Sequence, residues 1–449
     1  MTVVQPLADC WADSMRRSMQ PTATPRASKI RWQIAGLAGL GTVITNIDRS
    51  TISVALPFMS HDLHIPPIIE GLVLSWFFLA YAIVLLPAGV LVDKFGARLV
   101  YGIGGVLWGI ATLATAAVTG IVSLLGLRLL LGVGEAAQYP SCIKATQQWF
   151  PLRERTAATG LWDLGARVGG VITLPLVAGI IGVAGWRTAF VVVGALALIW
   201  AIGWLIEYRA PSEHRRVNAA ERALITEGSE EQPTERTKPR WVELFRHRST
   251  RALILGYFCF NYTAYFFITW FPSYLVKERG FNLLKLGFFG AIPGLVAVFT
   301  ELSSGFLQDK FIGMGRNPIK VRKGFIVIGM LISSVIALAV LVPSAGVALA
   351  LLTLSYGALL VGGPSLGTFP SIYAPQGSQI GALAGVQNSA GNVAGFLGPI
   401  VTGAIITVTG SFIVPLLLTG GIALLGAFTF LVILPNRSSN RALDEALTA

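Results

Sequence analysis

The sequence predicts an all-α membrane protein with twelve transmembrane helices in two six-helix halves. Of its 449 residues, 54% are hydrophobic and only 12% are charged, whereas soluble domains carry about 25% charged residues. Apolar segments of roughly 20 residues recur along nearly the whole chain, which is the length that an α-helix needs to cross a bilayer. Strands of membrane β-barrels are about 10 residues long and alternate in polarity, so these segments are helices.

The apolar segments divide into two sets of six. They cover about 33–57, 71–91, 99–118, 120–142, 157–181, 187–207, 252–276, 285–307, 324–343, 346–368, 379–407 and 412–434. The long polar stretch between the sixth and seventh spans mixes both charge signs, as a solvated linker does. We therefore expect an N-terminal tail (1–32), a first half (33–207), a linker (208–251), a second half (252–434) and a C-terminal tail (435–449).

Basic residues gather in the loops on one side. They occur in the N-terminal tail, in "DKFGAR" (93–98), in "PLRER" (151–155), in the linker and in "DKFIGMGRNPIKVRK" (309–323). Cytoplasmic loops carry an excess of Lys and Arg, so both termini and the linker are expected in the cytoplasm. This orientation accounts for the net charge of +12 without nucleic acid as a partner. The three cysteines have no paired spacing and predict neither a disulfide nor a metal site.

Ionisable residues within the spans are the strongest functional signal. The first span contains Asp48 and Arg49, the fourth Arg128 and Glu135, the fifth Asp163 and Arg167, and the eighth Glu301. Each such residue costs about 2.5–3.5 kcal/mol at a helix centre on insertion scales. From their depths, Asp48, Arg128, Glu135 and Arg167 are expected to line one cavity in the first half.

The types of these charged residues suggest a division of roles. Arginine can hold a carboxylate through two parallel hydrogen bonds, so Arg49 and Arg128 suit an anionic substrate. A carboxyl group removed from water favours its neutral form, so Asp48 and Glu135 can carry protons. Asp163 and Arg167 are spaced to pair directly; this pair is either structural or part of the substrate site.

A short repeat joins the two halves. "GVLVDKFGARLV" (89–100) follows the second span, and "SGFLQDKFIGMGR" (304–316) follows the eighth. The first copy resembles the signature loop of the major facilitator superfamily, through the residues Gly89, Asp93, Lys94, Gly96 and Arg98. The resemblance implies the major facilitator fold and a gating role for this loop.

Longer motifs resemble one branch of that superfamily, the anion:cation symporters. They are "DRSTISVALP" (48–57), "RLLLGVGEAAQYPS" (128–141), "YFFITWFPSYLVKERGF" (265–281) and "GVQNSAGNVAGFLGPIVTG" (385–403). The branch includes bacterial galactonate, hexuronate, glucarate, tartrate and phthalate permeases, with sialin and vesicular glutamate transporters. The resemblance implies that Asp48 and Glu135 couple protons and that Arg49, Arg128, Tyr81 and Asn392 bind substrate. In the aromatic seventh span, Asn261, Tyr262 and Tyr265 are also expected to face the cavity.

The function expected from this resemblance is proton-coupled symport of a small organic anion into the cell by alternating access. The anion is a sugar acid, a dicarboxylate or an aromatic carboxylate, and the location is the bacterial inner membrane. The coupling ion is H⁺, with no other cofactor or metal, and a monomer is the expected functional unit. Arg167 departs from the sugar-acid permeases of the branch and suggests a dicarboxylate.

Three rival functions have less support. A proton-coupled exporter of drugs or cations is the main alternative, but the fifth span reads "GARVGGVITLP", without the G-P-x-x-G-G stretch of such exporters. Two cavity arginines would also repel a cation. An enzyme lacks a visible nucleophile, base and acid set, since His61 and His64 are the only close histidine pair. A sensor would need a soluble domain larger than the linker.

Overall fold

The computed structural model describes residues 27–226, 241–374 and 379–436, and every regular element in these ranges is helical. Nine helices in the described ranges are long and apolar enough to cross a membrane. Two of them, α3 and α6, bend at a single glycine and supply two spans each, and α2 supplies the first. The twelve predicted spans are thus confirmed. The basic residues Arg16, Arg17 and Arg26 lie outside the described ranges.

The first half runs from α2 to α6. Its helices are α2 (Ile30–Asp62), α3 (Pro67–Thr115), α4 (Ile121–Glu135), α5 (Gln138–Trp149) and α6 (Arg155–Glu207), with a 3₁₀ turn at Leu152–Glu154. The bends in α3 and α6 lie at Gly96 (φ 81°) and Gly185 (φ 80°). Glycine adopts a positive φ without steric cost, so these two residues allow a reversal with almost no loop.

The second half follows two short helices, α7 (Ala219–Thr226) and α8 (Trp241–Arg246). It comprises α9 (Arg248–Thr269), α10 (Phe271–Lys277), α11 (Leu283–Phe289), α12 (Ala291–Gly313), α13 (Pro318–Ser333), α14 (Ala345–Leu360), α15 (Gly363–Tyr373), α16 (Ile380–Thr409) and α17 (Ile413–Phe428). A 3₁₀ segment η2 (Ser334–Val340) extends α13, and a π-helical turn η4 (Thr429–Ile433) extends α17.

Several spans are longer or less continuous than their apolar runs suggest. The first was expected at 33–57, but α2 covers Ile30–Asp62. The seventh breaks between α9 and α10, just before Pro272, and the fourth breaks between α4 and α5, just before Pro140. Proline has no N–H to donate within a helix, so both breaks occur where the hydrogen-bond ladder is interrupted.

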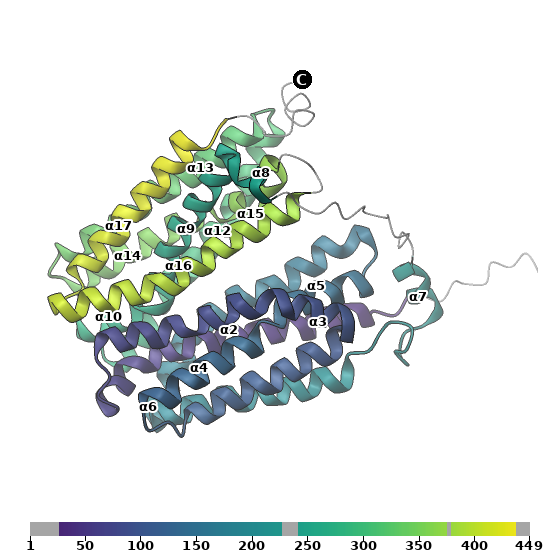
Figure 1. Cartoon of the computed structure of the whole chain (residues 1–449), viewed down its shortest axis with the longest axis horizontal. Coiled ribbons are helices and arrows are strands. Elements are labelled where there is room, and N and C mark those ends of the chain that lie inside the picture. The colour runs from purple at the N-terminus through teal and green to yellow at the C-terminus, as the bar shows by residue number, and fades with distance from the viewer. Residues whose placement is uncertain (1–26, 227–240, 375–378, 437–449) are drawn as a thin grey trace, which may run out of the picture.

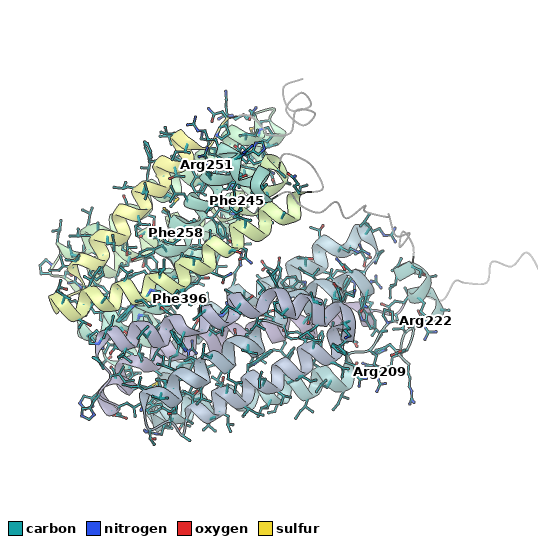
Figure 2. All side chains as sticks on the ribbon, in the orientation of Figure 1. Arg209, Arg222, Phe245, Arg251, Phe258 and Phe396 are labelled. Atoms are coloured by element: carbon teal, nitrogen blue, oxygen red, sulfur yellow. The ribbon has the colours of Figure 1, made fainter. Side chains whose placement is uncertain are left out.

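The two halves meet at one end and diverge at the other. Figure 1 shows the first half (purple to blue-green) and the second half (green to yellow) diverging toward the end that carries α7 and α8. We call this the linker end and the opposite end the far end. Contacts between halves join α3 to α16, α6 to α11 and α2 to α10. Phe396 on α16 lies at the boundary between the two halves (Figure 2) and packs against the core of the first half.

The far end is closed by close packing and one ion pair. A Cβ atom at Gly71 of α3 would overlap the Pro399 carbonyl oxygen of α16, and one at Gly403 would overlap the Pro67 carbonyl oxygen. The two helices therefore approach at backbone distance, as small residues allow in membrane proteins. Lys277 Nζ of α10 lies 2.5 Å from Glu70 Oε1 of α3, and the Glu70 side chain is only 1% exposed.

The polar linker contains a docked helix rather than only a solvated chain. Glu221 of α7 is fully buried and accepts hydrogen bonds from the backbone N–H groups of Ile30 and Arg31, which begin α2. Its carboxylate also pairs with Arg31 Nη1 at 2.9 Å, and Arg31 Nε lies 2.8 Å from Glu154. A carboxylate is favoured at a helix N-terminus, so α7 fixes the start of the first span.

Candidate functional site

A cavity of about 630 Å³ lies between the two halves. Both halves line it, with α2, α5 and α6 on one side and α9, α10, α12, α14, α15 and α16 on the other. Its polar lining residues are Asn46, Arg49, Ser50, Ser53, Tyr139, Asp163, Arg167, Thr173, Tyr257, Tyr265, Glu301, Tyr356 and Gln387. The cavity is large enough for a small solute and carries more than one charged group.

Arg49 connects this cavity to a buried acid. Its side chain is 22% exposed and lines the cavity, while Nη2 and Nε donate to Glu135 Oε2 at 2.8 and 3.2 Å. Glu135 is fully buried, and its other carboxylate oxygen has no hydrogen-bond partner among the described residues. The Arg49 guanidinium also lies over the rings of Phe77 (4.6 Å) and Tyr81 (5.1 Å).

Arg128 and Asp48 lie deeper in the first half. Arg128 is 4% exposed, and its Nε has no hydrogen-bond partner among the described residues. Its guanidinium lies 5.6 Å from the Phe77 ring centre, so one aromatic ring contacts both arginines. Asp48 is 1% exposed and accepts a hydrogen bond from the Thr112 hydroxyl at 2.5 Å. Behind the cavity wall there are thus two acids and one further arginine.

The expectation that Asp48, Arg128, Glu135 and Arg167 line one cavity is wrong. Only Arg167 does, together with Arg49. Successive residues on a helix point about 100° apart. Arg49 therefore faces the cavity while Asp48 faces Thr112 on α3. The depth of a residue along the helix axis does not indicate in which direction around the axis its side chain points.

Arg167 makes its short contact with the opposite half rather than with its own helix. Its Nη2 lies 2.6 Å from Glu301 Oε1 of α12, whereas Nη1 lies 3.7 Å from Asp163 Oδ2. The predicted pair within the fifth span is therefore the weaker of two contacts. Glu301 is visible in the sequence as a charge in an apolar segment, but its partner is 134 residues away and sequence spacing does not reveal it.

The other predicted binding residues divide into two groups. Tyr265 lines the cavity and Tyr81 contacts Arg49. Asn261 and Asn392 each donate to a backbone carbonyl one turn earlier in their own helix, at Tyr257 and Asn388. Neither of them lines the cavity, and Tyr262 does not line it either. The contributions of Tyr257, Tyr356 and Gln387 are not predictable from the sequence, because aromatic and amide residues in apolar helices carry no distinctive signal.

The predicted gating loop lies at the linker end of the first half. Asp93 pairs with Lys144 Nζ of α5 at 3.0 Å, and Arg98 donates twice to the Leu205 carbonyl of α6. Gly96 forms the bend, Gly89 has open space around it, and the Lys94 ammonium lies over the Phe95 ring. These contacts hold the loop to its own half in this conformation.

Two six-helix halves around a charged cavity, closed at one end, are the architecture of a secondary transporter. The chain belongs to the Major Facilitator Superfamily, whose family model matches residues 38–399. It is a multi-pass membrane transporter and not an enzyme.

Proteins of similar sequence indicate to which branch of the superfamily the chain is related. The chain is 33% identical to a probable sulfoacetate transporter of Cupriavidus necator, over 91% of this chain and 94% of that protein. It is 30% identical to a probable galactarate/D-glucarate transporter of Bacillus subtilis (92% and 94% covered) and to a D-galactonate transporter of Escherichia coli (92% and 97%). These relatives are organic-anion permeases, as the motifs predict.

Solved structures agree on the fold. An inward-facing, unoccupied bacterial homolog of the human lysosomal transporter Spinster has a TM-score of 0.72 at 19% identity, covering 90% of this chain and 98% of that one. A nucleoside transporter has a TM-score of 0.68 at 16% identity, covering 91% of this chain and all of that one.

Proposed function

We propose that this protein is a proton-coupled symporter that carries a small organic anion into the cell by alternating access. The observation that carries the proposal is the Arg49–Glu135 pair, in which a cavity-facing guanidinium is neutralised by a fully buried carboxylate. Relatives named for sulfoacetate, galactarate, glucarate and galactonate support an anionic substrate.

The geometry links anion binding to proton binding. An entering carboxylate or sulfonate needs the Arg49 donors that Glu135 now holds. Once displaced, Glu135 would be a buried, unpaired charge, which is strongly unfavourable. Uptake of one proton removes that charge, so each ligand favours binding of the other.

Asp48 and Arg128 extend this linkage behind the cavity wall. Protonation of Asp48 removes a negative charge from the cluster that contains Arg128 and Glu135, so the cluster becomes more positive and attracts an anion. We assign proton coupling to Asp48 and Glu135, and substrate binding to Arg49 and Arg128. Tyr81 contacts the Arg49 guanidinium, and Tyr265 lines the cavity. Asn261 and Asn392 are proposed to enter the site in another conformation.

The closed far end and the diverging linker end represent one state of the transport cycle. Because basic loops mark the cytoplasmic side, we propose that the linker and both termini are cytoplasmic, in a bacterial inner membrane. The conformation is then inward-facing. The loop around Asp93 is proposed to gate the linker end. One chain contains the whole cavity, so a monomer is the proposed functional unit.

The test uses purified protein in proteoliposomes that enclose a pH-sensitive dye. Sugar acids, sulfoacetate and aromatic carboxylates are added singly without an imposed gradient, and Arg49→Gln liposomes serve as the control. Internal acidification by one acid, absent with Arg49→Gln, is the expected result. No acidification by any acid, with alkalinisation on adding a lipophilic cation, would contradict the proposal and favour an exporter.

A further inference from the structure

A second arginine–glutamate pair in the cavity has the same construction as the first. Arg167 Nη2 lies 2.6 Å from Glu301 Oε1, and Arg49 Nη2 lies 2.8 Å from Glu135 Oε2. In both pairs the arginine is the more exposed partner, at 31% against 11% for the second pair and 22% against 0% for the first. Both arginines line the same cavity.

The two pairs differ in which helices they join. Arg49 and Glu135 lie on α2 and α4 of the first half, whereas Arg167 on α6 and Glu301 on α12 connect the two halves. A buried ion pair gains little stability over apolar packing of the same volume. A pair that faces a solute cavity is also open to competition by any anion that enters it.

The surroundings of Glu301 allow its carboxylate to lose Arg167. The charged or titratable groups that face it are Arg167 and Asp163 on α6 and Tyr356 on α14. A Cβ atom at Gly363, the first residue of α15, would lie 2.9 Å from Glu301 Oε1, so glycine at this position leaves the carboxylate unobstructed. No second cation faces Glu301 among these groups, so a displaced Glu301 becomes neutral only by taking up a proton.

From this geometry we propose that Arg167 is the binding residue for a second acidic group of the substrate, and that Glu301 occupies its place in the empty transporter. The substrate class is then a dianion, a dicarboxylate or a sulfonate-carboxylate, rather than a monocarboxylate. Its first acidic group binds Arg49 and its second binds Arg167. This inference rests on the proposed anion–proton symport and adds one proton, accepted by Glu301, for the second negative charge.

The test measures binding of matched acids to the purified full-length protein. Glucarate and gluconate, and galactarate and galactonate, differ only by a terminal carboxylate in place of a hydroxymethyl group. Sulfoacetate and glycolate form a smaller pair, in which a sulfonate replaces a hydroxyl. Affinity is determined by calorimetry across a range of pH, and the number of protons bound is taken from its pH dependence.

The wild type is expected to bind at least one dianion at least tenfold more tightly than its monoanion, with one additional proton. Arg167→Gln should lower that ratio about tenfold, which corresponds to about 1.4 kcal/mol. Glu301→Gln, which keeps the arginine and removes its competitor, should raise dianion affinity at neutral pH and abolish the additional proton. This second variant tests the same pair if Arg167→Gln fails to fold.

Two outcomes would overturn the inference in distinguishable ways. If the acids bind in an Arg49-dependent manner, but the dianion-to-monoanion ratio and the proton difference are the same in wild type, Arg167→Gln and Glu301→Gln, then the second pair is structural and only this inference fails. If no acid binds the wild type in an Arg49-dependent manner, the proposed function itself is wrong and the inference fails with it.

Discussion

Adjacent residues in the first span have different surroundings. Arg49 reaches the cavity and pairs with Glu135, while Asp48 is 1% exposed and accepts from Thr112. The physical reason is helical geometry, since a step of one residue rotates a side chain by about 100°. The groups proposed to bind the proton and the anion therefore lie next to each other in the sequence, but only Arg49 lines the cavity.

Asp48→Asn is expected to abolish proton-driven accumulation of the anion while leaving exchange. The amide keeps the size of the side chain but cannot bind and release a proton, so the accumulation ratio falls to about 1, as for any uncoupled carrier. Uptake and counterflow into proteoliposomes measure the two activities. The control is Glu213→Gln, an exposed linker carboxylate; normal accumulation by Asp48→Asn would disprove the coupling role.

Glu135→Gln is expected to raise anion affinity at neutral pH while abolishing accumulation. Removing the competing carboxylate leaves Arg49 free in the empty transporter, and a larger competent fraction raises apparent affinity in proportion. An increase of about tenfold would correspond to about 1.4 kcal/mol. Binding isotherms at several pH values measure it. Weaker binding at every pH would mean that Glu135 positions Arg49 instead of competing for it.

Among the elements, α7 has a specific attachment. Its Glu221 accepts from the Ser28 hydroxyl at 2.5 Å and pairs with Arg31 at 2.9 Å, at the start of α2. Figure 2 shows Arg222, the next residue, on the same short helix. The exposed Arg222 therefore provides a control on the same element.

Glu221→Ala is expected to lower the free energy of unfolding by roughly 3–5 kcal/mol, because it leaves Arg31 buried without one of its partners. Arg222→Ala should change it by less than about 0.5 kcal/mol, as surface substitutions usually do. Denaturant unfolding of both variants in the same detergent measures the difference. Equal losses for the two variants would show that α7 does not stabilise α2 through Glu221.

The contact between α3 and α16 depends on glycine at both Gly71 and Gly403. Gly403→Ala is expected to weaken closure of the far end by about 1–3 kcal/mol, the usual cost of overpacking. Gly381→Ala on the same helix is the matched control, since that position has open space. Ser273 on α10 is buried at the far end, and Ser273→Cys serves as a reporter of its exposure. This cysteine should react faster with an impermeant thiol reagent when it is combined with Gly403→Ala, but not when it is combined with Gly381→Ala. Equal labelling rates would contradict the closure role.

For the whole molecule, the Glu70–Lys277 pair joins the halves at the closed end. The alternating access proposed for this protein requires this end to open when the linker end closes. The pair must therefore break in each cycle, which makes it a determinant of the balance between the two conformations.

Lys277→Gln is expected to shift the balance toward the state that is open at the far end. Losing a hydrogen bond to a charged group costs the closed state about 1.5–3 kcal/mol, or roughly a 10- to 150-fold change in population. Distances between spin labels on the two halves at the far end should lengthen. The control is Lys285→Gln, an exposed lysine at the same end, and identical distance distributions would refute the gate.

Hydropathy and residue type were enough to predict twelve spans, two halves and the charged residues within the membrane. Both properties are local, and every segment that spans a bilayer must meet the same requirements of length and polarity. The kinds of groups in the site, Arg49, Arg128, Asp48 and Glu135, follow from the cost of burying a charge and are therefore visible in the sequence as well.

Only the tertiary structure decided which of these charges reach the cavity and what they contact. Asp48 and Glu135 lie behind the wall, Arg167 contacts Glu301 of the other half rather than relying on Asp163, and α3 meets α16 at glycines. Each of these facts depends on helix rotation and on contacts between residues more than 60 positions apart. Helix packing sets both, and no local pattern in the chain records them.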